Sequence, residues 1–399
     1  MTLHVVGAGL AGLSCALTAI DSGIDVVLHE SAGQAGGRCR SWLEPSIGEI
    51  IDNGTHMVVG GNNALFAYLR RIGATDRLMS APAAFPMIDL AGGRPWTATP
   101  FRLLPSLIAS GWRMKGDQNA TIAQCLDRSR NYRRFWEPLA LAVMNTPAEE
   151  ASAQVFRRVL AKTLWRGQAA SRPYVVRKSL SDTFVIPALA ALSTAGATLR
   201  LGQPLRRLVC EGRRASELVF DDQTVLLRPN DQVVLALPWM VAAGLLPGLP
   251  KLPSSPIVNA HFRLTVPPTK LSSGGFIGLL GGTAQWLFVR DHVVSVTVSA
   301  AAAVAERSVD ELRQTLWEDV AKALELHDLP VASRIIKEKR ATIFHSPAIE
   351  SLRPDATFGE NLFLAGDWTA TGLPCTLEGA IRSGVIAFQA SAARARNAG

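Results

Sequence analysis

The hydrophobic positions near the start of the chain change their spacing twice before residue 31. Residues 3–6 (LHVV) form a short apolar run, residues 10–23 place apolar and small side chains at helical spacing, and residues 24–30 (IDVVLHE) return to a strand pattern. The pattern predicts a strand, a helix and a second strand, with a glycine-rich turn (GAGLAG, residues 7–12) after the first strand. This order is typical of the βαβ unit of a nucleotide-binding sheet.

Two later parts of the chain carry related patterns. Residues 196–238 alternate short apolar runs with Gly and Asp turns, which predicts a succession of strands. Near the end, residues 362–366 (LFLAG) predict an apolar strand, and residues 375–391 predict a helix. This helix is expected to start without a side-chain cap, and a helix start with free N–H groups favours an anionic ligand.

Residues 96–166 are mainly helical in pattern and rich in Trp, Leu and Arg. Apolar and cationic side chains mix most closely in residues 94–115, where they are Trp96, Phe101, Leu103, Leu104, Leu107, Ile108 and Trp112 with Arg94, Arg102, Arg113 and Lys115. This mixture fits a membrane surface. It fits a helix buried in a lid domain equally well, because Pro100 and Pro105 interrupt any long amphipathic helix.

Composition narrows the choice of partners. The 399 residues are 48% hydrophobic, which is enough for a sizeable core, and the net charge is +8. The basic residues are scattered in short pairs without the pattern of a recognised module, so we expect no nucleic-acid partner. Five widely spaced cysteines without a CxxC pair argue against disulfides and against a metal site, and they fit a cytoplasmic protein. We expect neither a signal peptide nor a membrane span, since prolines and glycines break the uncharged run at 233–250.

The glycine-rich turn supplies the first candidate chemistry. In a GxGxxG turn the first glycine permits the tight turn, the second lets the backbone approach a pyrophosphate, and the third lets helix and strand pack closely. Glu30 ends the second strand, where a carboxylate can accept hydrogen bonds from a ribose. Because the strand, the helix, the second strand and the acidic residue follow one another at the spacing of this motif, the sequence predicts a dinucleotide site.

Further motifs indicate which dinucleotide is bound. Residues 36–41 (GGRCRS) resemble the GGRxxS signature of the flavin amine oxidase and phytoene desaturase superfamily, and residues 52–56 (DNGTH) are similar to its D-x-G-x-H stretch. Residues 135–156 (FWEPLALAVMNTPAEEASAQVF) and 364–384 (LAGDWTATGLPCTLEGAIRSG) resemble the hydroxysqualene dehydroxylases, the squalene-associated flavoproteins of hopanoid pathways.

The resemblance implies FAD as the cofactor and assigns binding roles to particular residues. Those expected around the pyrophosphate and ribose are Gly7, Gly9, Leu10, Ala11, Gly12, Glu30, Ser31, Gly36, Gly37 and Arg38. Those expected along the ribityl chain and flavin are Gly54, His56, Gly366, Asp367, Thr376 and Leu377, while the strand around Val209 is expected at the adenine. His56 fits a structural role as well as a catalytic one.

The resemblance also implies a mixed α/β (α+β) fold. We expect a Rossmann-like FAD-binding domain of the GR2 type, assembled from residues 1–75, 191–249 and 351–399. Residues 76–190 and 250–350 are expected to form a β-sheet substrate domain and a helical lid.

By the same resemblance, the protein is an FAD-dependent oxidoreductase that removes the hydroxyl of hydroxysqualene to give squalene. Its substrate is then a long apolar isoprenoid. If residues 94–115 lie at the surface, we expect the protein to make a peripheral contact with the inner face of the cytoplasmic membrane. Loss of an allylic hydroxyl requires a proton donor and a dry tunnel. His56 and Glu378 are candidate donors, but no spacing selects either, so no catalytic residue is assigned. The external electron donor is not identified.

Two alternatives use the same fold. One is an FAD-dependent desaturase or oxidase of a phytoene-like polyisoprenoid or an amine. The other is a lipid carrier without flavin chemistry, like the prenyl-binding GDP dissociation inhibitors, and the intact glycine motifs argue against it.

Overall fold

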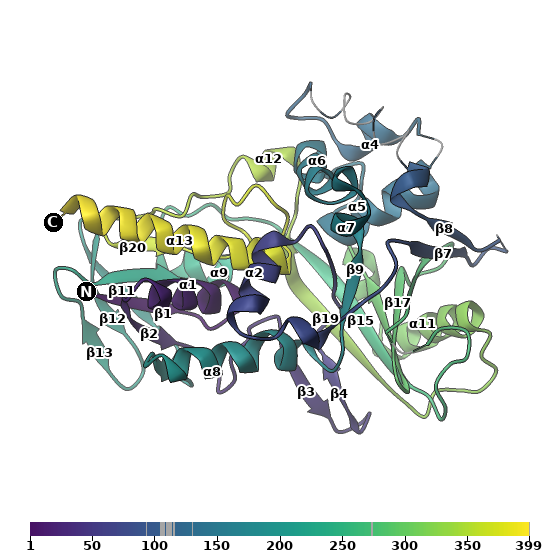
Figure 1. Cartoon of the computed structure of the whole chain (residues 1–399), viewed down its shortest axis with the longest axis horizontal. Coiled ribbons are helices and arrows are strands. Elements are labelled where there is room, and N and C mark those ends of the chain that lie inside the picture. The colour runs from purple at the N-terminus through teal and green to yellow at the C-terminus, as the bar shows by residue number, and fades with distance from the viewer. Residues whose placement is uncertain are drawn as a thin grey trace.

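The structure is a computed structural model that describes residues 1–92, 94–103, 108, 114, 116–129, 131–272 and 274–398. Two large sheets organise these residues (Figure 1). We call the part built on the five-stranded sheet the parallel-sheet half, and the part built on the seven-stranded sheet, with the helices that pack on it, the mixed-sheet half.

The parallel sheet draws its five strands from segments far apart in the chain. In spatial order they are β10 (Thr198–Arg200), β2 (Asp25–His29), β1 (Thr2–Val6), β14 (Gln232–Leu235) and β20 (Leu362–Leu364). The central strand β1 pairs in parallel on both sides, with Val5 opposite Leu28 of β2 and Val234 of β14. The predicted mixed α/β fold with a Rossmann-like sheet is confirmed.

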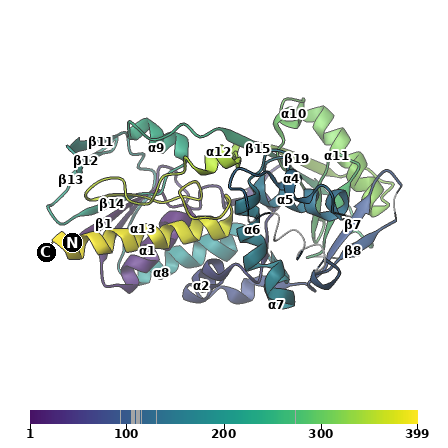
Figure 2. The same cartoon turned by 90° about the horizontal axis from the view of Figure 1, so that it is seen from above.

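Different layers cover the two faces of this sheet (Figure 2). One face carries the helices α1 (Leu10–Asp21), α2 (Asn63–Arg71), α8 (Ile186–Thr194) and α13 (Leu377–Ala398). The other face carries β11 (Arg207–Glu211), β12 (Arg214–Val219), β13 (Thr224–Leu226) and α9 (Trp239–Leu245). Helices α1 and α13 touch closely, since a Cβ on Gly384 would lie 2.1 Å from the carbonyl oxygen of Ala11. The two ends of the chain therefore form one packed unit.

The mixed sheet combines strands from residues 85–98 with strands from residues 254–343. In spatial order its strands are β19 (Ala332–Ile343), β15 (Ser254–Arg263), β18 (Val293–Val298), β17 (Trp286–Arg290), β16 (Phe276–Leu280), β7 (Phe85–Asp89) and β8 (Trp96–Ala98). Strands β7 and β16 pair in parallel, with Met87 opposite Gly278. Helices α10 (Ala302–Ala305) and α11 (Val309–Leu324) cover one face, and α11 begins at a capping box formed by Ser308 and Glu311.

Short helices cover the other face of the mixed sheet and form a lid. They are α4 (Ile122–Leu126), the π-helical turn η2 (Tyr132–Trp136), α5 (Glu137–Met144), α6 (Ala153–Lys162), η3 (Leu164–Arg166) and α7 (Gly167–Ser171). Buried aromatic residues of the lid and the sheet, together with one methionine, meet in a lid–sheet cluster, which we define as Phe85, Met87, Phe135, Trp136, Phe156, Phe276, Trp286 and Phe288. The predicted helical lid is thus present. Leu104, Leu107, Trp112, Arg113 and Lys115, which entered the membrane prediction, lie outside the described residues.

Small elements connect the two halves. They are β3 (Ser41–Glu44), β4 (Glu49–Asp52), β5 (Met57–Val59), η1 (Thr75–Arg77), β6 (Leu78–Ser80), β9 (Pro173–Val176), η4 (Ser181–Val185) and α12 (Pro347–Glu350). Helix α8 starts at Ile186 and packs on α1, close to the domain limit expected at residue 191. The domain limits themselves stay a prediction. Within the described ranges, no helix has both the length and the apolar composition needed to cross a membrane.

Candidate functional site

The turn between β1 and α1 separates two kinds of glycine. A Cβ on Gly7 would lie 2.3 Å from the carbonyl oxygen of Ala236, and a Cβ on Gly12 would lie 1.8 Å from that of Gly7. Gly7 also has a φ of +105°, which favours glycine. By contrast, no atom lies within 4 Å of a Cβ placed on Gly9. Gly7 and Gly12 are therefore required by packing, whereas Gly9 leaves space that a ligand can use.

The start of α1 is available to such a ligand. Gly9 is the N-cap residue and offers no side-chain cap, so the following residues Leu10 and Ala11 lie at a helix start of positive electrostatic potential. Both side chains are buried in the core of the parallel-sheet half. They can therefore bind a ligand through the backbone only.

Glu30 lies beside this turn, at the end of β2. Its carboxylate accepts hydrogen bonds from the N–H of Ala8 (2.7 Å), the N–H of Ala32 (2.9 Å) and the hydroxyl of Ser31 (3.0 Å). The same carboxylate thus joins the first glycine turn to the chain after β2. A ribose contact at Glu30 stays a prediction.

The second glycine turn packs directly on the first. The N–H of Gly36 donates to the carbonyl of Ala8 at 2.8 Å, and Gly9 and Gly36 form an isolated parallel bridge. Gly36 and Gly37 have φ values of +115° and +57°, so both positions favour glycine. Two turns that the sequence predicted separately thus form one surface.

Arg38 joins this surface to the end of the chain. Its Nη2 donates to both carboxylate oxygens of Asp367, at 2.7 and 2.8 Å, and its Nη1 donates to the carbonyl of Ala341. The Asp367 side chain is buried, whereas 37% of the Arg38 side chain is exposed. Arg38 therefore neutralises a buried carboxylate and still has surface that a phosphate can reach.

The start of α13 differs from the prediction in one respect. The Thr376 hydroxyl accepts a hydrogen bond from the N–H of Gly379 at 3.1 Å, which is an N-cap. The prediction of a helix without a side-chain cap is therefore wrong, because Thr376 was considered only as a cofactor contact. Among the described residues, none accepts a hydrogen bond from the N–H of Leu377 or Glu378. The cap thus leaves two donors at the helix start.

Gly366 and Asp367 form the turn before that helix start. Gly366 has a φ of +154°, and its N–H donates to the hydroxyl of Ser383 at 2.8 Å. A Cβ on Gly366 would lie 2.3 Å from Nε1 of Trp368. The turn therefore requires glycine for its shape, and it presents Asp367 to Arg38.

Asp52 anchors the predicted D-x-G-x-H stretch to the mixed-sheet half. Its carboxylate accepts hydrogen bonds from the Ser41 hydroxyl (2.6 Å) and the N–H of Leu180 (2.9 Å), and it forms an ion pair with Arg290 (2.7 Å). Its carbonyl is hydrogen-bonded to Nε2 of His261 at 3.0 Å. With four partners, Asp52 serves to hold this stretch in place.

The rest of the stretch lies between the two halves. A Cβ on Gly54 would lie 3.0 Å from Nδ2 of Asn259 in β15, so the glycine allows a close approach. Burial lowers the pKa of His56; the charge of Arg38 lowers it further, and that of Asp52 raises it. His56 is consequently neutral near pH 7, and a neutral imidazole is a weak proton donor.

Glu378, the other candidate proton donor, has a structural partner. Its carboxylate accepts hydrogen bonds from the N–H groups of Ala64 (3.2 Å) and Leu65 (2.8 Å), in the first turn of α2. Asn62, the N-cap residue of α2, forms no side-chain cap. Glu378 therefore caps α2 from a different helix.

The chain next to the acidic strand end is β10 and the connection after it, not β11, the strand predicted at the adenine. The N–H of Gln203 donates to the carbonyl of Glu30 at 2.8 Å, and the N–H of Glu30 donates to the carbonyl of Arg200 at 2.8 Å. Val209 lies further along, on β11, where its carbonyl accepts a hydrogen bond from the Ser216 hydroxyl at 3.4 Å. An adenine contact at Val209 stays a prediction.

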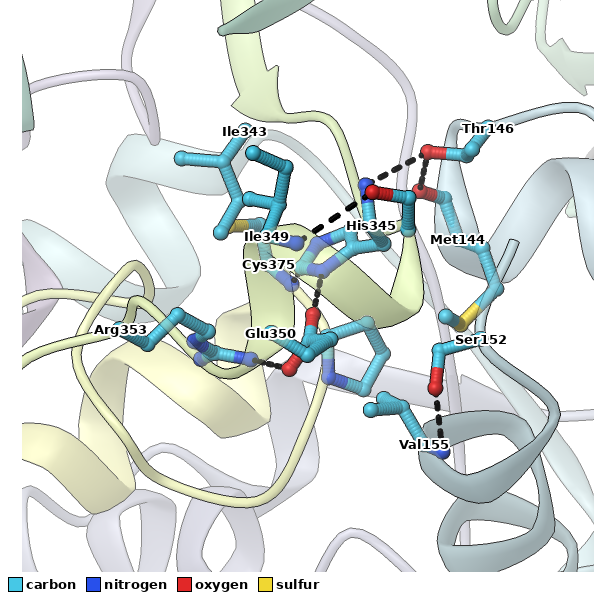
Figure 3. A network of polar contacts seen from close by, with 12 residues as sticks. Met144, Thr146, Ser152, Val155, Ile343, His345, Ile349, Glu350, Arg353 and Cys375 are labelled. Carbon is cyan, nitrogen blue, oxygen red and sulfur yellow. Dashed lines mark hydrogen bonds and ion pairs between the residues drawn. The ribbon is translucent and has the colours of Figure 1, made fainter. Parts of the chain in front are cut away.

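Three residues behind the α13 turn were missed by the sequence analysis. His345, Glu350 and Arg353 form a chain of polar contacts that reaches Cys375 (Figure 3). Arg353 also binds the carbonyl of Asp367. No motif marks them, because their partners are mostly backbone groups. A histidine, a glutamate and an arginine close together in the chain were the only signal.

The described residues fit FAD. The space at Gly9 and the free N–H groups at the start of α1 suit a pyrophosphate, with the cation of Arg38 nearby. The N–H groups at the start of α13 suit the negative charge of a reduced flavin. The lid–sheet cluster is a buried apolar core between the lid and the mixed sheet, and Met57, next to His56, packs against it.

Comparison with known proteins agrees with this fit. A family model described as flavin-containing amine oxidoreductase matches residues 10–390. Hydroxysqualene dehydroxylases from Sinorhizobium fredii and Rhodopseudomonas palustris are each 37% identical to this chain, over 406 and 412 residues. In both cases the match covers 96% of this chain and 96% of the relative.

A solved structure of an oxidoreductase from Methanosarcina mazei shows the same fold, with a TM-score of 0.75. It is 13% identical and the match covers 96% of this chain and 99% of that chain, so it supports the fold alone. The predicted superfamily and the predicted FAD cofactor are confirmed. The chain belongs to the flavin-containing amine oxidoreductase family and, within it, to the family of the hydroxysqualene dehydroxylases.

Proposed function

We propose that this protein is an FAD-dependent enzyme that converts hydroxysqualene to squalene. The observation that carries the proposal is similarity to hydroxysqualene dehydroxylases along nearly the whole chain, which includes the mixed-sheet half and not only the cofactor motifs. In the proposed reaction the carbon–oxygen bond breaks, the oxygen leaves as water after taking up a proton, and the carbon receives a hydride.

The proposal assigns FAD to the surface formed by the two glycine turns and the start of α13. When bound and reduced, FAD supplies the hydride. The backbone at Gly9, Gly36 and Gly37 and the Arg38 guanidinium would hold the pyrophosphate, and Glu30 would hold the ribose. The start of α13, at Thr376 and Leu377, would face the flavin.

The lid–sheet cluster is the proposed binding surface for the hydrocarbon. Phe85 links the lid to the sheet, because its ring centroid lies 5.9 Å from that of Phe135 in the lid and 6.4 Å from that of Phe276 in the sheet. A carbocation formed by loss of an allylic hydroxyl would react with water, so the enzyme must exclude it. A surface of aromatic and aliphatic side chains binds a long isoprenoid and keeps water out by the same means.

The proton donor is not assigned to either candidate from the sequence. The Glu378 carboxylate is occupied by two N–H donors of α2, and burial keeps His56 neutral. Reduction of FAD between turnovers requires an external electron donor, to which no residue is assigned.

We also propose a peripheral contact with the cytoplasmic face of the membrane. Phe101 and Ile108 are 79% and 60% exposed, and the exposed Arg102 lies between them in sequence. Exposed apolar side chains beside a cation suit a membrane surface. Liposomes that contain anionic lipid should bind the wild type. They should bind the double variant that carries Phe101→Ser and Ile108→Ser more weakly. Equal recovery of both proteins in the supernatant would remove this proposal.

The proposed reaction is tested under anaerobic conditions. Protein with photoreduced FAD is mixed with hydroxysqualene, and flavin absorbance and squalene are followed together. We expect the flavin to reoxidise with one squalene formed per flavin. If the flavin stays reduced in the presence of hydroxysqualene, the substrate assignment is wrong, and oxidised enzyme should then be tested with phytoene-like polyenes and amines.

A further inference from the structure

Three charged or titratable side chains, buried or nearly so, lie directly behind the turn that leads into α13. They are His345, Glu350 and Arg353, which we call the His345 triad (Figure 3). On the basis of the FAD-dependent function proposed above, we propose that the triad is a positioning unit with two tasks. It fixes residues 367–375 so that the first N–H groups of α13 face the flavin, and it ties this turn to the lid.

Arg353 fixes the first part of the turn. Its Nη2 donates to the carbonyls of Asp367 (2.6 Å) and Thr369 (2.5 Å), and its Nη1 donates to the carbonyl of Leu373 (2.7 Å). Its Nε donates to the carbonyl of Trp368 at 3.3 Å. Four carbonyl groups that converge on one buried guanidinium allow the backbone a single path. Arg38 binds the carboxylate of Asp367 on the cofactor side, so residue 367 is held through both its backbone and its side chain.

His345 fixes the last part of the turn. Its Nε2 accepts a hydrogen bond from the N–H of Cys375 at 2.9 Å, so Nδ1 carries the ring proton and donates it to a carboxylate oxygen of Glu350. The other oxygen of Glu350 accepts from Arg353 at 2.8 Å. Because Cys375 is only two residues before Leu377, the direction of its N–H sets the direction in which α13 begins.

The charges of the triad are consistent with this role. Burial raises the pKa of Glu350, but the hydrogen bond from His345 and the contact with Arg353 lower it by more, so the carboxylate stays ionised. An ionised Glu350 keeps the His345 ring in the orientation that accepts the Cys375 N–H.

The backbone of His345 is bound by the lid. Its N–H donates to the hydroxyl of Thr146, directly after α5, at 2.9 Å. Its carbonyl accepts from the N–H of Ser152, the N-cap residue of α6, at 2.8 Å. One residue thus holds the flavin-facing turn with its side chain and the lid with its backbone. A change in the position of the lid would consequently reach the α13 start through His345.

A purely structural role for the triad makes a different prediction. Loss of a structural network lowers the stability of the whole protein but leaves the folded fraction with normal cofactor affinity. Loss of a positioning unit weakens FAD binding and changes the flavin potential in protein that is still folded. FAD affinity and potential therefore separate the two roles, without a need for catalytic turnover.

We would compare His345→Phe and His345→Gln with Leu312→Ala as the matched control. Leu312 is fully buried in α11, far from the turn in the fold, so its truncation destabilises the protein without touching the site. Apoprotein of each variant is titrated with FAD below its unfolding temperature, and the midpoint potential of bound FAD is measured. Thr146→Val serves if His345→Phe does not fold. It keeps the triad and removes only the Thr146 hydroxyl, which accepts from the His345 N–H and donates to the carbonyl of Met144 at 3.1 Å.

We expect His345→Phe to weaken FAD binding about tenfold or more and to shift the midpoint potential to more negative values. His345→Gln keeps an acceptor for the Cys375 N–H and should stay within about threefold of the wild type. Thr146→Val should have an FAD affinity and a midpoint potential between those of His345→Phe and His345→Gln. Leu312→Ala should lower the unfolding temperature and leave both flavin measurements unchanged.

If His345→Phe and Thr146→Val both keep wild-type FAD affinity and potential while their unfolding temperatures fall, the triad is structural only and the inference is wrong. This outcome differs from failure of the proposed function. In that case wild-type protein would bind FAD and fail to form squalene, whereas the FAD titrations of the variants would still test the triad.

Discussion

The parallel-sheet half and the mixed-sheet half offer different physical means of binding a ligand. In the parallel-sheet half, two glycine turns and the start of α1 come from residues 7–37, and they present backbone groups at fixed positions. In the mixed-sheet half, the lid–sheet cluster forms only when β7 pairs with β16 and the lid packs over both. In the proposed function, an anion would be recognised by local backbone geometry, whereas a hydrocarbon would be recognised by apolar side chains from many segments.

Substitutions in the first glycine turn should have the largest effects, and they separate packing from ligand binding in the parallel-sheet half. Gly12→Val should destabilise the protein by about 3 kcal/mol, because the new Cβ would lie 1.8 Å from the carbonyl oxygen of Gly7. Gly9→Val should fold normally, since no atom lies within 4 Å of its Cβ, and yet be purified without yellow colour. Thermal unfolding and the absorbance of bound flavin check the two variants together. Full FAD occupancy in Gly9→Val would show that the pyrophosphate lies elsewhere.

Each half also buries a histidine whose charge is suppressed, and this predicts sensitivity to acid. Burial lowers the pKa of His29 to about 3, with His4 and Arg200 acting in the same direction, and burial lowers the pKa of His261 to about 4. The ordinary value is 6.5, so below that pH the unfolded chain binds protons that the folded protein does not. Stability should therefore be complete above pH 6.5 and fall toward pH 4, by up to about 1.4 kcal/mol per pH unit for each histidine.

Urea unfolding between pH 7.5 and 5 measures this effect, with His29→Phe as the comparison. The His29 ring is stacked on Phe220 at a centroid distance of 4.6 Å, so a phenyl ring can replace it. The variant should lose less stability on acidification than the wild type. If both lose the same amount, His29 is not among the groups responsible.

The ion pair between Arg38 and Asp367 tests whether the two ends of the chain share one ligand site. Arg38→Ala leaves a buried carboxylate without its cation, and we expect a loss of about 1 to 2 kcal/mol, reduced because 37% of the Arg38 side chain is exposed. FAD occupancy should fall as well. Arg206→Ala is the matched control, because Arg206 pairs with Asp221 where both side chains are exposed, and it should change neither property. A normally loaded Arg38→Ala protein would remove Arg38 from the FAD site.

The sequence predicted the parallel-sheet half well because its signals are local. Gly9, Glu30 and Gly36 lie close together in the chain, and their spacing alone restricts the geometry that they can form. The His345 triad could not be predicted in this way, since Arg353 binds four backbone carbonyls and a carbonyl carries no sequence signature. The Thr376 cap was missed because one residue suited two roles.

Glu378 gives the smallest expected effect and bears directly on the difference between the halves. Its carboxylate caps α2, so Glu378→Ala should cost about 1 kcal/mol of stability, the usual value of an N-cap, and leave squalene formation unchanged below the unfolding temperature. Glu378→Gln keeps one acceptor and should lose less. If instead both variants keep their stability and lose activity by about a hundredfold or more, Glu378 donates the proton. The parallel-sheet half would then supply the reaction's acid as well as its cofactor, and the mixed-sheet half would contribute only the apolar surface.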